Sequence, residues 1–346
     1  MPVFSASQLE PLASGIFRGA GAPADIADRV AHSLVVSNLM GHDSHGVLRI
    51  PSYLEAIEKG TCVPSARPTT QEETATTARI DGNWAFGQIT AHYATQVAIE
   101  KAEGAGVAAV TFLRCNHIGR LGEYTEQAAR GGMVAFMVGG TFNGGAVTPY
   151  GGAGRVMGTN PIAFGVPAGE EGPVVTDMAT SVVAEGKLRV ARAKHVPLAP
   201  GVIVDKDGNP SIDAEDYYAG GMLLPFGGHK GYGLSVVVDL LGRHLTGGDK
   251  LAGDEAVSFG NFMFVVKVDA FRPLAEFQQV VSGRLEQIKS VKKAPGFDEV
   301  LVPGEPERRT MALRERDGIT LPEDTVKDLS SLADRYGVAM PVARRM

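Results

Sequence analysis

The sequence has few cysteines and no long apolar run, and each shortage excludes a class of protein. Its 346 residues contain two cysteines, Cys62 and Cys115, too few for a disulfide framework and too far apart for a Cys-x-x-Cys zinc motif. No stretch reaches the roughly 18 consecutive apolar residues that a membrane-spanning helix needs. The first residues, "MPVFSASQLEPLASG", lack the charged and apolar regions of a signal peptide. We therefore expect a soluble protein of the reducing cytoplasm.

Clustered positive charge is also lacking. The net charge is −6 at pH 7, from 33 basic and 39 acidic side chains, and the sequence contains no basic run. Nucleic acids and anionic membranes are bound by clustered cations, so neither is an expected partner.

Two common nucleotide-binding motifs are absent or unusable. The Walker A pattern G-x-x-x-x-G-K-[ST] does not occur. The one G-x-G-x-x-A match, at Gly19, Gly21 and Ala24, contains Pro23 and follows no predicted strand. A dinucleotide that binds this chain must therefore bind to a fold other than the Rossmann fold.

Glycine, in contrast, is abundant at 44 residues, which suits the tight turns of α/β enzymes. Both ends of the chain have helical patterns, the first with a capping-box pattern at Ser7 and Glu10. We predict a layered α/β domain over residues 73–304 and a small helical domain formed by residues 1–72 and 305–346. The β-rich runs of the central part are 106–113, 132–138, 172–178, 200–205 and 261–271.

The stretch "GHDSHGVLR" at residues 41–49 concentrates reactive side chains. If a helix begins near His45, then His45, Arg49 and Tyr53 lie four residues apart on one face. Such a face offers a proton donor, a carboxylate-binding fork and a hydroxyl to one small molecule. The same spacing also fits a polar helix surface with an incidental histidine. Pro51 predicts a kink or a late helix start.

A metal site is the competing interpretation of the same stretch. His42, Asp43 and His45 could serve a metal-dependent hydrolase or lyase, although the H-E-x-x-H pattern is missing. A Ser-His-Asp triad is less favoured, because Ser44 has no G-x-S-x-G elbow. A binding protein without catalytic activity is a third possibility.

Two further clusters follow predicted strands or turns. "RCNHIGRLGEY", at residues 114–124, places Asn116 and His117 at the carboxyl end of a strand, where α/β sheets hold ligands. "PFGGHKGYG", at residues 225–233, places His229 and Lys230 at a helix start that can hold a phosphate. For the first cluster an ordinary strand-to-helix turn is the commoner explanation, and for the second a flexible glycine turn explains the residues equally well.

Six stretches in this order resemble the second type of malate/L-lactate dehydrogenase over nearly the whole chain. They are "SHGVLRIPSY", "NHIGRLGEY", "GTNPIAFGVP", "DMATSVVAEGK", "LLPFGGHKGYGLS" and "VPGEPERR". The family includes sulfolactate and ureidoglycolate dehydrogenases, 2,3-diketo-L-gulonate reductase and piperideine-2-carboxylate reductase. "HIGRLGEY" and "GKLRVA" are most similar to its hydroxycarboxylate dehydrogenase B branch.

The resemblance implies an NAD(P)-dependent oxidoreductase on a non-Rossmann α/β fold. It implies a homodimer with active sites near the interface, and hydride transfer between nicotinamide C4 and C2 of a 2-hydroxy or 2-oxo acid. Reduction of a cyclic imine is the alternative within the family. The choice between NAD and NADP stays open, although Arg308 and Arg309 could contact a 2′-phosphate.

The resemblance also implies roles for individual residues. His45, with Ser44 beside it, is the proton donor, and His117 is the rival for that role. Arg49 holds the substrate carboxylate. Tyr53, Thr159 and Asn160 complete the expected substrate contacts. The implied cofactor contacts are His117, Ile118, Gly119, Arg120, Leu121, Asp177, Met178, Ala179, His229, Lys230, Gly304, Glu305, Pro306 and Arg309. Many relatives have small residues where this chain has Arg120 and Glu123.

Overall fold

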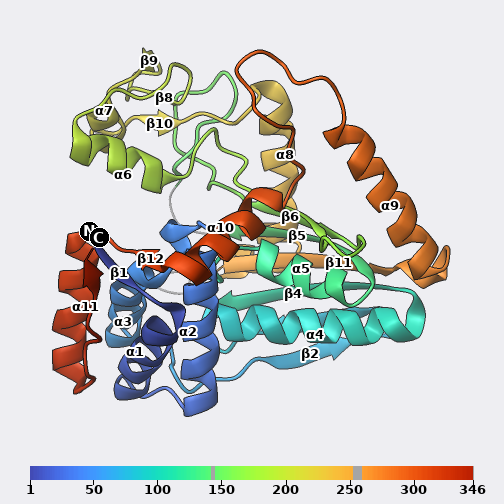
Figure 1. Ribbon diagram of the computed structural model, residues 1–346, viewed down its shortest axis with the longest axis horizontal. Coiled ribbons are helices and arrows are strands. Elements are labelled where there is room, and N and C mark those ends of the chain that lie inside the picture. The colour runs from blue at the N-terminus through green and yellow to red at the C-terminus, as the bar shows by residue number, and fades with distance from the viewer. Residues whose placement is uncertain (142–144, 252–258, 346) are drawn as a thin grey trace.

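The computed structural model describes residues 1–141, 145–251 and 259–345. Its centre is a seven-stranded mixed sheet in the order β2-β3-β4-β11-β5-β6-β7 (Figure 1). β3 and β4 run parallel and the other neighbouring pairs run antiparallel. The strands are β2 (Thr69–Glu73), β3 (Thr77–Asp81), β4 (Val107–Cys115), β5 (Met133–Thr141), β6 (Ile162–Val166), β7 (Val174–Met178) and β11 (Phe259–Lys267). The mixed sheet confirms the α/β class.

Small side chains let the helices pack closely on this sheet. α4 (Gly87–Ala105) and α5 (Gly122–Arg130) cover one face. α4 presents a stripe of fully buried alanines at helical spacing, at positions 91, 94, 98 and 102, to alternate residues of β4. The other face is covered by α8 (His229–Asp239) and the π-helical turn η3 (Leu240–His244).

The two ends of the chain meet beside the sheet. β12 (Ile319–Thr320), β1 (Pro2–Phe4) and β13 (Arg344–Arg345) form a small three-stranded sheet that the sequence did not predict. A shared hydrophobic core joins α1 (Ala6–Gly19), α2 (Ala24–Leu39), α3 (Ile50–Glu58) and α11 (Glu323–Tyr336), with α10 (Glu305–Asp317) alongside (Figure 1). The division at residues 72 and 305 stays a prediction.

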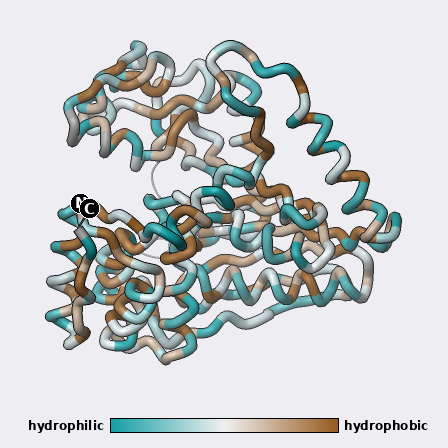
Figure 2. Tube along the Cα trace, viewed as in Figure 1, coloured by the Kyte–Doolittle hydropathy of each residue, from teal (hydrophilic) through white to brown (hydrophobic). Residues whose placement is uncertain are grey.

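A separate lobe lies above the sheet and has its own hydrophobic core. It contains α6 (Glu185–Lys194), α7 (Ala214–Tyr218) and a short sheet of β8 (Ile203–Val204), β9 (Pro210–Ser211) and β10 (Met222–Leu223). The predicted run 200–205 therefore shortens to two strand residues. α9 (Leu274–Lys289) forms an arm on the opposite side, where hydrophilic and hydrophobic positions alternate and no residue is fully buried (Figure 2).

Two predicted helix starts are wrong. The first helix begins at Ala6, because Ser5 and Gln8 form the capping box, rather than Ser7 and Glu10. The third begins at Ile50 rather than near His45, with Pro51 in its first turn, so the late start is confirmed. Within the described ranges, no helix is long and apolar enough to span a bilayer.

Candidate active site

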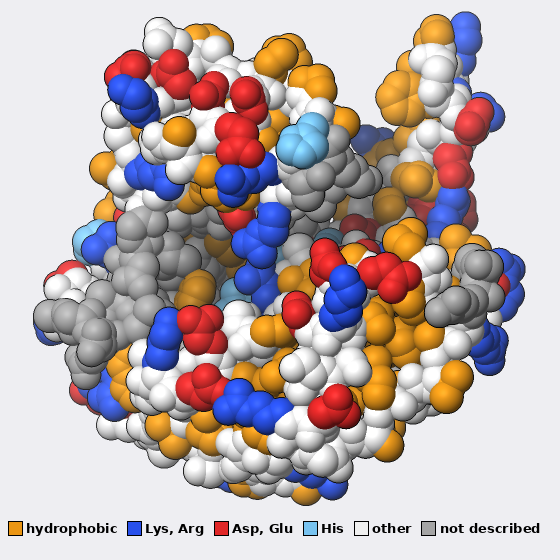
Figure 3. Space-filling model, turned by 90° about the vertical axis from the view of Figure 1, so that its left-hand side faces the viewer, with side chains coloured by type: hydrophobic (Ala, Val, Ile, Leu, Met, Phe, Trp, Pro, Cys, Tyr) orange, Lys and Arg blue, Asp and Glu red, His pale blue; other side chains and the backbone are white. Residues whose placement is uncertain are grey.

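A cleft opens between the lobe and the sheet, and the molecule is hollowed there in Figure 3. Its walls come from the turn after α2, the ends of β4 and β7, and the start of α6. The structure brings twelve of the sequence-predicted site residues together in this cleft. They are Ser44, His45, Arg49, His117, Ile118, Gly119, Arg120, Leu121, Thr159, Asp177, Met178 and Ala179.

The segment that carries His45 and Arg49 folds as two 3-10 turns, η1 (Asp43–His45) and η2 (Val47–Arg49). The three residues His45, Arg49 and Tyr53 therefore do not share one face of a continuous helix, and that prediction is wrong. His45 and Tyr53 nevertheless converge on His117, whose ring stacks with that of His45 and whose Nδ1 contacts the Tyr53 hydroxyl.

Buried Asn38 explains why the chain turns here. Its Oδ1 accepts a hydrogen bond from the N–H of Val47 at 2.9 Å, and its Nδ2 donates to Asp43 Oδ1 at 2.7 Å. Gly46 is required, because a Cβ at that position would lie 2.2 Å from Asn38 Oδ1. The side-chain amide of Asn38 thus bonds to residues on both sides of Gly46, and the backbone turns here instead of continuing as a regular helix.

Arg49 is held in place but keeps its charge available. Its Nε donates to the backbone oxygen of Ser44 at 2.7 Å, which fixes the direction of the guanidinium. Across the described part of the chain, no carboxylate forms an ion pair with it. The outer nitrogens of the fork therefore present an uncompensated positive charge to the cleft.

Two histidine rings lie beside this arginine. The rings of His45 and His117 are stacked, with centroids 5.4 Å apart. Burial and the charge of Arg49 lower the pKa of His45 from 6.5 to about 4. The same causes, burial first, hold the pKa of His117 well below its usual value. Both rings are therefore uncharged at neutral pH.

The Nδ1 atom of each histidine has a hydroxyl partner. Ser44 Oγ lies 2.9 Å from Nδ1 of His45, and Tyr53 Oη lies 2.8 Å from Nδ1 of His117. Buried Gln88 donates from Nε2 to Tyr53 Oη at 2.7 Å, and burial raises the pKa of Tyr53 to about 12. Within the described ranges no hydrogen bond occupies Nε2 of either ring, which leaves that atom for exchange with a ligand.

Gln88 is a site residue that sequence reasoning missed. It lies at the start of α4, fully buried, and no motif around "AFGQIT" marks it. Tyr53 was predicted as a substrate contact, but its hydroxyl points to His117 and its ring lines an adjoining cavity.

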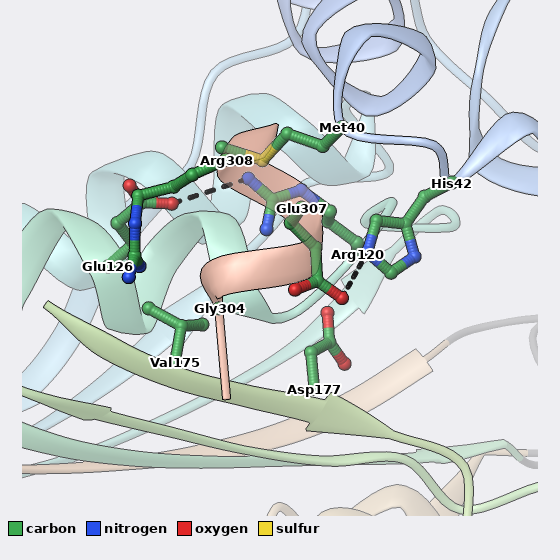
Figure 4. A pocket seen from close by; sticks show the side chains of 9 residues that line it. All are labelled: Met40, His42, Arg120, Glu126, Val175, Asp177, Gly304, Glu307 and Arg308. Carbon is green, nitrogen blue, oxygen red and sulfur yellow. Dashed lines mark ion pairs between the residues drawn. The ribbon is translucent and has the colours of Figure 1, made fainter. Parts of the chain in front are cut away.

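The far end of the cleft is rich in paired charges, and a smaller pocket opens beside it. Figure 4 shows His42, Asp177 and Glu307 pointing toward one another there. His42 Nε2 lies 3.7 Å from Glu307 Oε1, and Arg120 Nη2 lies 3.5 Å from Glu126 Oε2. The backbone N–H of Gly122 donates to Asp177 Oδ2 at 2.7 Å, while burial raises the pKa of that carboxyl. From the sequence, His42 was a candidate only for a metal site, and Glu126 was missed.

Some predicted contacts lie outside the cleft. Asn160 is fully buried and donates from Nδ2 to the Ser235 backbone oxygen at 3.1 Å. His229 and Lys230 are exposed at the start of α8, and Pro306 is exposed in the first turn of α10.

The other predicted residues at the start of α10 divide between two places. Glu305 pairs with Lys289 at 3.0 Å and with Arg309 at 2.6 Å. Arg309 also pairs with Glu299, so its charge is balanced on the surface. Gly304 and Arg308 line the smaller pocket beside Asp177.

The geometry opposes the metal interpretation. The carboxylate of Asp43 pairs with Arg314 at 2.6 Å and with Asn38, while His45 faces His117. Among the residues that the structure describes, no three His, Cys, Asp or Glu side chains gather as metal ligands.

The chain is similar to known proteins over nearly its full length. Residues 4–330 match the family described as malate/L-lactate dehydrogenase. The chain is 36% identical to a malate dehydrogenase of Pyrococcus horikoshii, over 92% of this chain and 91% of that protein. It is 34% identical to hydroxycarboxylate dehydrogenase B of Escherichia coli, over 97% and 94%.

Solved structures show the same fold. Malate dehydrogenase from Entamoeba histolytica superposes with a TM-score of 0.92 at 29% identity, covering 98% of this chain and 99% of that one. Δ1-Piperideine-2-carboxylate reductase from Pseudomonas syringae superposes with a TM-score of 0.83 at 30% identity, covering 96% and 100%.

Proposed function

Because the chain belongs to the malate/L-lactate dehydrogenase family, we propose that it transfers a hydride between nicotinamide C4 and C2 of a 2-hydroxy or 2-oxo acid. One observation carries the proposal. Arg49 reaches the cleft without a carboxylate partner among the described residues and lies beside two uncharged histidines. A small carboxylic acid supplies the anion that this arrangement lacks.

Arg49 binds the substrate carboxylate in this proposal. Its Nε is already bonded to Ser44, so the fork is oriented before the substrate arrives. Thr159, from the turn before β6, lines the same cleft and contacts the substrate.

His45 holds and moves the proton. The bound carboxylate cancels much of the field of Arg49, which raises the pKa of His45 once substrate is in place. Ser44 contacts Nδ1, so Nε2 gives a proton to the carbonyl oxygen during reduction and takes it back during oxidation. Tyr53 and Gln88 keep the neighbouring His117 oriented.

The residues at the far end of the cleft fit a nicotinamide cofactor. Buried Arg120 has no hydrogen-bond partner for its Nε among the described residues, and the cleft continues past Asp177 and Ala179. When bound, the cofactor supplies or accepts the hydride. The segment from Ile118 to Leu121 and the end of β7 with Ala179 would hold it, and Gly304 and Arg308 line the adjoining smaller pocket. Either NAD or NADP is compatible with this proposal.

A homodimer is part of the proposal. Val237, Leu240 and Leu245 are 49%, 52% and 56% exposed along α8 and the turn that follows it. Apolar side chains gathered on one surface element are typical of an interface with another chain. Analytical ultracentrifugation tests this, and a monomer at micromolar concentration contradicts it.

The experiment that tests the function is titration with NADH and NADPH, followed by turnover of a panel of 2-oxo acids. His45→Ala is expected to lower kcat by about 10²–10⁴-fold, the usual worth of a general acid. If His45→Ala keeps kcat and His117→Ala abolishes it, the proton donor is His117. Absence of turnover with every oxo acid contradicts the function.

Reduction of a cyclic imine is the second candidate. The structural similarity to a piperideine-2-carboxylate reductase favours it, and Arg49 would bind the ring carboxylate in the same way. Adding Δ1-piperideine-2-carboxylate to the panel decides between the two.

A further inference from the structure

A second cavity, here called the side cavity, adjoins the cleft behind Arg49. The two share Arg49, His117 and Phe259, so the groups proposed to bind the carboxylate stand at their junction. A 2-oxo acid whose carboxylate rests on Arg49 therefore has two places for the substituent on C2. One is the cleft, where the cofactor is proposed to lie, and the other is the side cavity.

Apolar side chains form much of the wall of the side cavity. Ala56 contributes from α3, and Phe86 and Phe259 contribute aromatic rings. Cys62, 3% exposed, completes this part, and burial raises the pKa of its thiol to about 12, so it carries no charge. Such a wall favours an alkyl or aromatic group.

Three polar side chains of the wall already donate their hydrogens to backbone oxygens. Ser52 Oγ donates to the Arg49 backbone oxygen at 2.8 Å, and Thr61 Oγ1 donates to the Ala56 backbone oxygen at 3.2 Å. Asn116 Nδ2 faces three backbone oxygens, those of Thr61, Trp84 and Ala85, at 3.1, 3.2 and 3.2 Å. These three groups therefore present lone pairs and carbon atoms to the cavity.

Arg49 is thus the one cation among the described residues that line the side cavity, and the proposed substrate carboxylate uses it. A second carboxylate or a sulfonate placed here would have to share Arg49 with the first carboxylate, because the described residues of the wall offer no further cation. An anion in that position is therefore less favourable than the same anion in water.

We propose that the side cavity receives the substituent on C2 of the oxo acid, and that it selects uncharged alkyl, aromatic or cyclic substituents over anionic ones. This inference rests on the proposed function, because Arg49 must bind the carboxylate for the side cavity to receive the substituent. It narrows the substrate class to 2-oxo monocarboxylates and the related cyclic imines.

The first test compares 2-oxobutyrate, 2-oxohexanoate and phenylpyruvate with oxaloacetate and 3-sulfopyruvate on the full-length protein with the preferred cofactor. The uncharged substrates are expected to have kcat/KM values at least about 100-fold higher, because leaving a buried polar group unpaired discriminates strongly. Equal or higher values for oxaloacetate overturn the inference and leave the proposed function standing. No turnover of any compound contradicts the function itself.

The second test changes the charge of the side cavity. Ala56→Arg adds a cation to the wall, and Ala56→Met adds similar bulk without charge. The ratio of kcat/KM for oxaloacetate to that for 2-oxobutyrate is expected to be at least about 10-fold higher in Ala56→Arg than in Ala56→Met. The same ratio in both variants overturns the placement of the substituent.

A second pair keeps this test decisive if the Ala56 variants unfold. Thr61→Lys and Thr61→Met act from the loop after α3, with thermal unfolding measured on both. The ratio is expected to rise in Thr61→Lys alone, and an unchanged ratio in folded protein counts against the inference.

Discussion

The two halves of the cleft treat charge in opposite ways. Near His45 and His117, a single arginine stands without a carboxylate among the described residues, and burial together with its charge lowers the pKa of both rings. At the other half, Arg120 faces Glu126 and His42 faces Glu307. An arginine left without a counter-ion requires an anion from outside, whereas balanced charges stabilise the fold around a ligand. This contrast supports the proposal that the substrate carboxylate binds in the first half.

Arg49→Ala is expected to give the largest effect, lowering kcat/KM for 2-oxo acids by about 10³-fold, because truncation of a buried charge partner costs roughly 2–5 kcal/mol. Arg49→Lys keeps the charge but loses the fork, so about 100-fold is expected. Steady-state kinetics measures both. Arg67→Ala, which removes an exposed arginine paired with Asp25, is the control and should leave kcat/KM unchanged. A similar loss in both alanine variants contradicts the comparison.

The pH profile of reduction follows from the low pKa of His45. In the free protein this pKa is about 4, so the protonated fraction falls tenfold for each pH unit above that value. The kcat/KM for reduction is expected to fall with the same slope between about pH 5 and 8. The kcat profile should break at a higher pH than the kcat/KM profile. The bound carboxylate offsets the positive charge of Arg49 and thereby raises the pKa of His45. A flat kcat/KM profile contradicts the role of His45.

Stability should depend on pH through the same group. The pKa of His45 is lowered from 6.5 to about 4 on folding, so the unfolded chain binds the extra proton between these values. Its contribution, up to about 3 kcal/mol, is present above pH 6.5 and lost as pH falls toward 4. Urea unfolding of the wild type and of His45→Gln measures it. The variant should lose less stability across this window, and parallel curves contradict the assignment.

Tyr53→Phe tests the hydroxyl that orients His117. It removes the 2.8 Å contact to Nδ1 while keeping the buried ring, so kcat is expected to fall by about 10-fold with little change in KM. Gln88→Met removes the donor behind it and should give a smaller loss in the same direction. NMR titration of the His117 ring separates this from a packing defect, because only a hydroxyl effect changes the tautomer. An unchanged ring signal in Tyr53→Phe contradicts the positioning role.

The sequence predicted which residues gather in the cleft better than it predicted their arrangement. His45, Arg49 and His117 belong to motifs, so their types and spacing were visible along the chain. The shape of the turn depends on Asn38, a buried amide in the preceding helix that bonds across Gly46, and no local pattern reveals that contact. Gln88 and the side cavity arise where α3, α4 and the sheet meet, so they exist only after the chain has folded.

The fold shows the same division. The long strands β4, β5 and β11 were predicted because each contains a run of apolar residues that is longer than the turn-forming stretches beside it. The two-residue strands of the lobe and of the chain ends carry too few residues for a period to appear. Pairing with distant segments defines them instead.

The smallest effect is expected from Glu307→Gln in the charge-balanced half. The hydrogen bond from His42 lowers the pKa of Glu307 below its ordinary value of 4.5, so its contribution is present above that pH and lost as pH falls below it. Since the side chain is about one-third exposed, solvent screening keeps this contribution under about 1 kcal/mol. With 2-oxobutyrate, kcat should change by less than about 3-fold. Glu323→Gln, at the exposed start of α11, is the matched control for urea unfolding at pH 4 and 7. A loss of kcat comparable to that of Arg49→Lys would mean that both halves bind the reacting acid, and the contrast between them would fail.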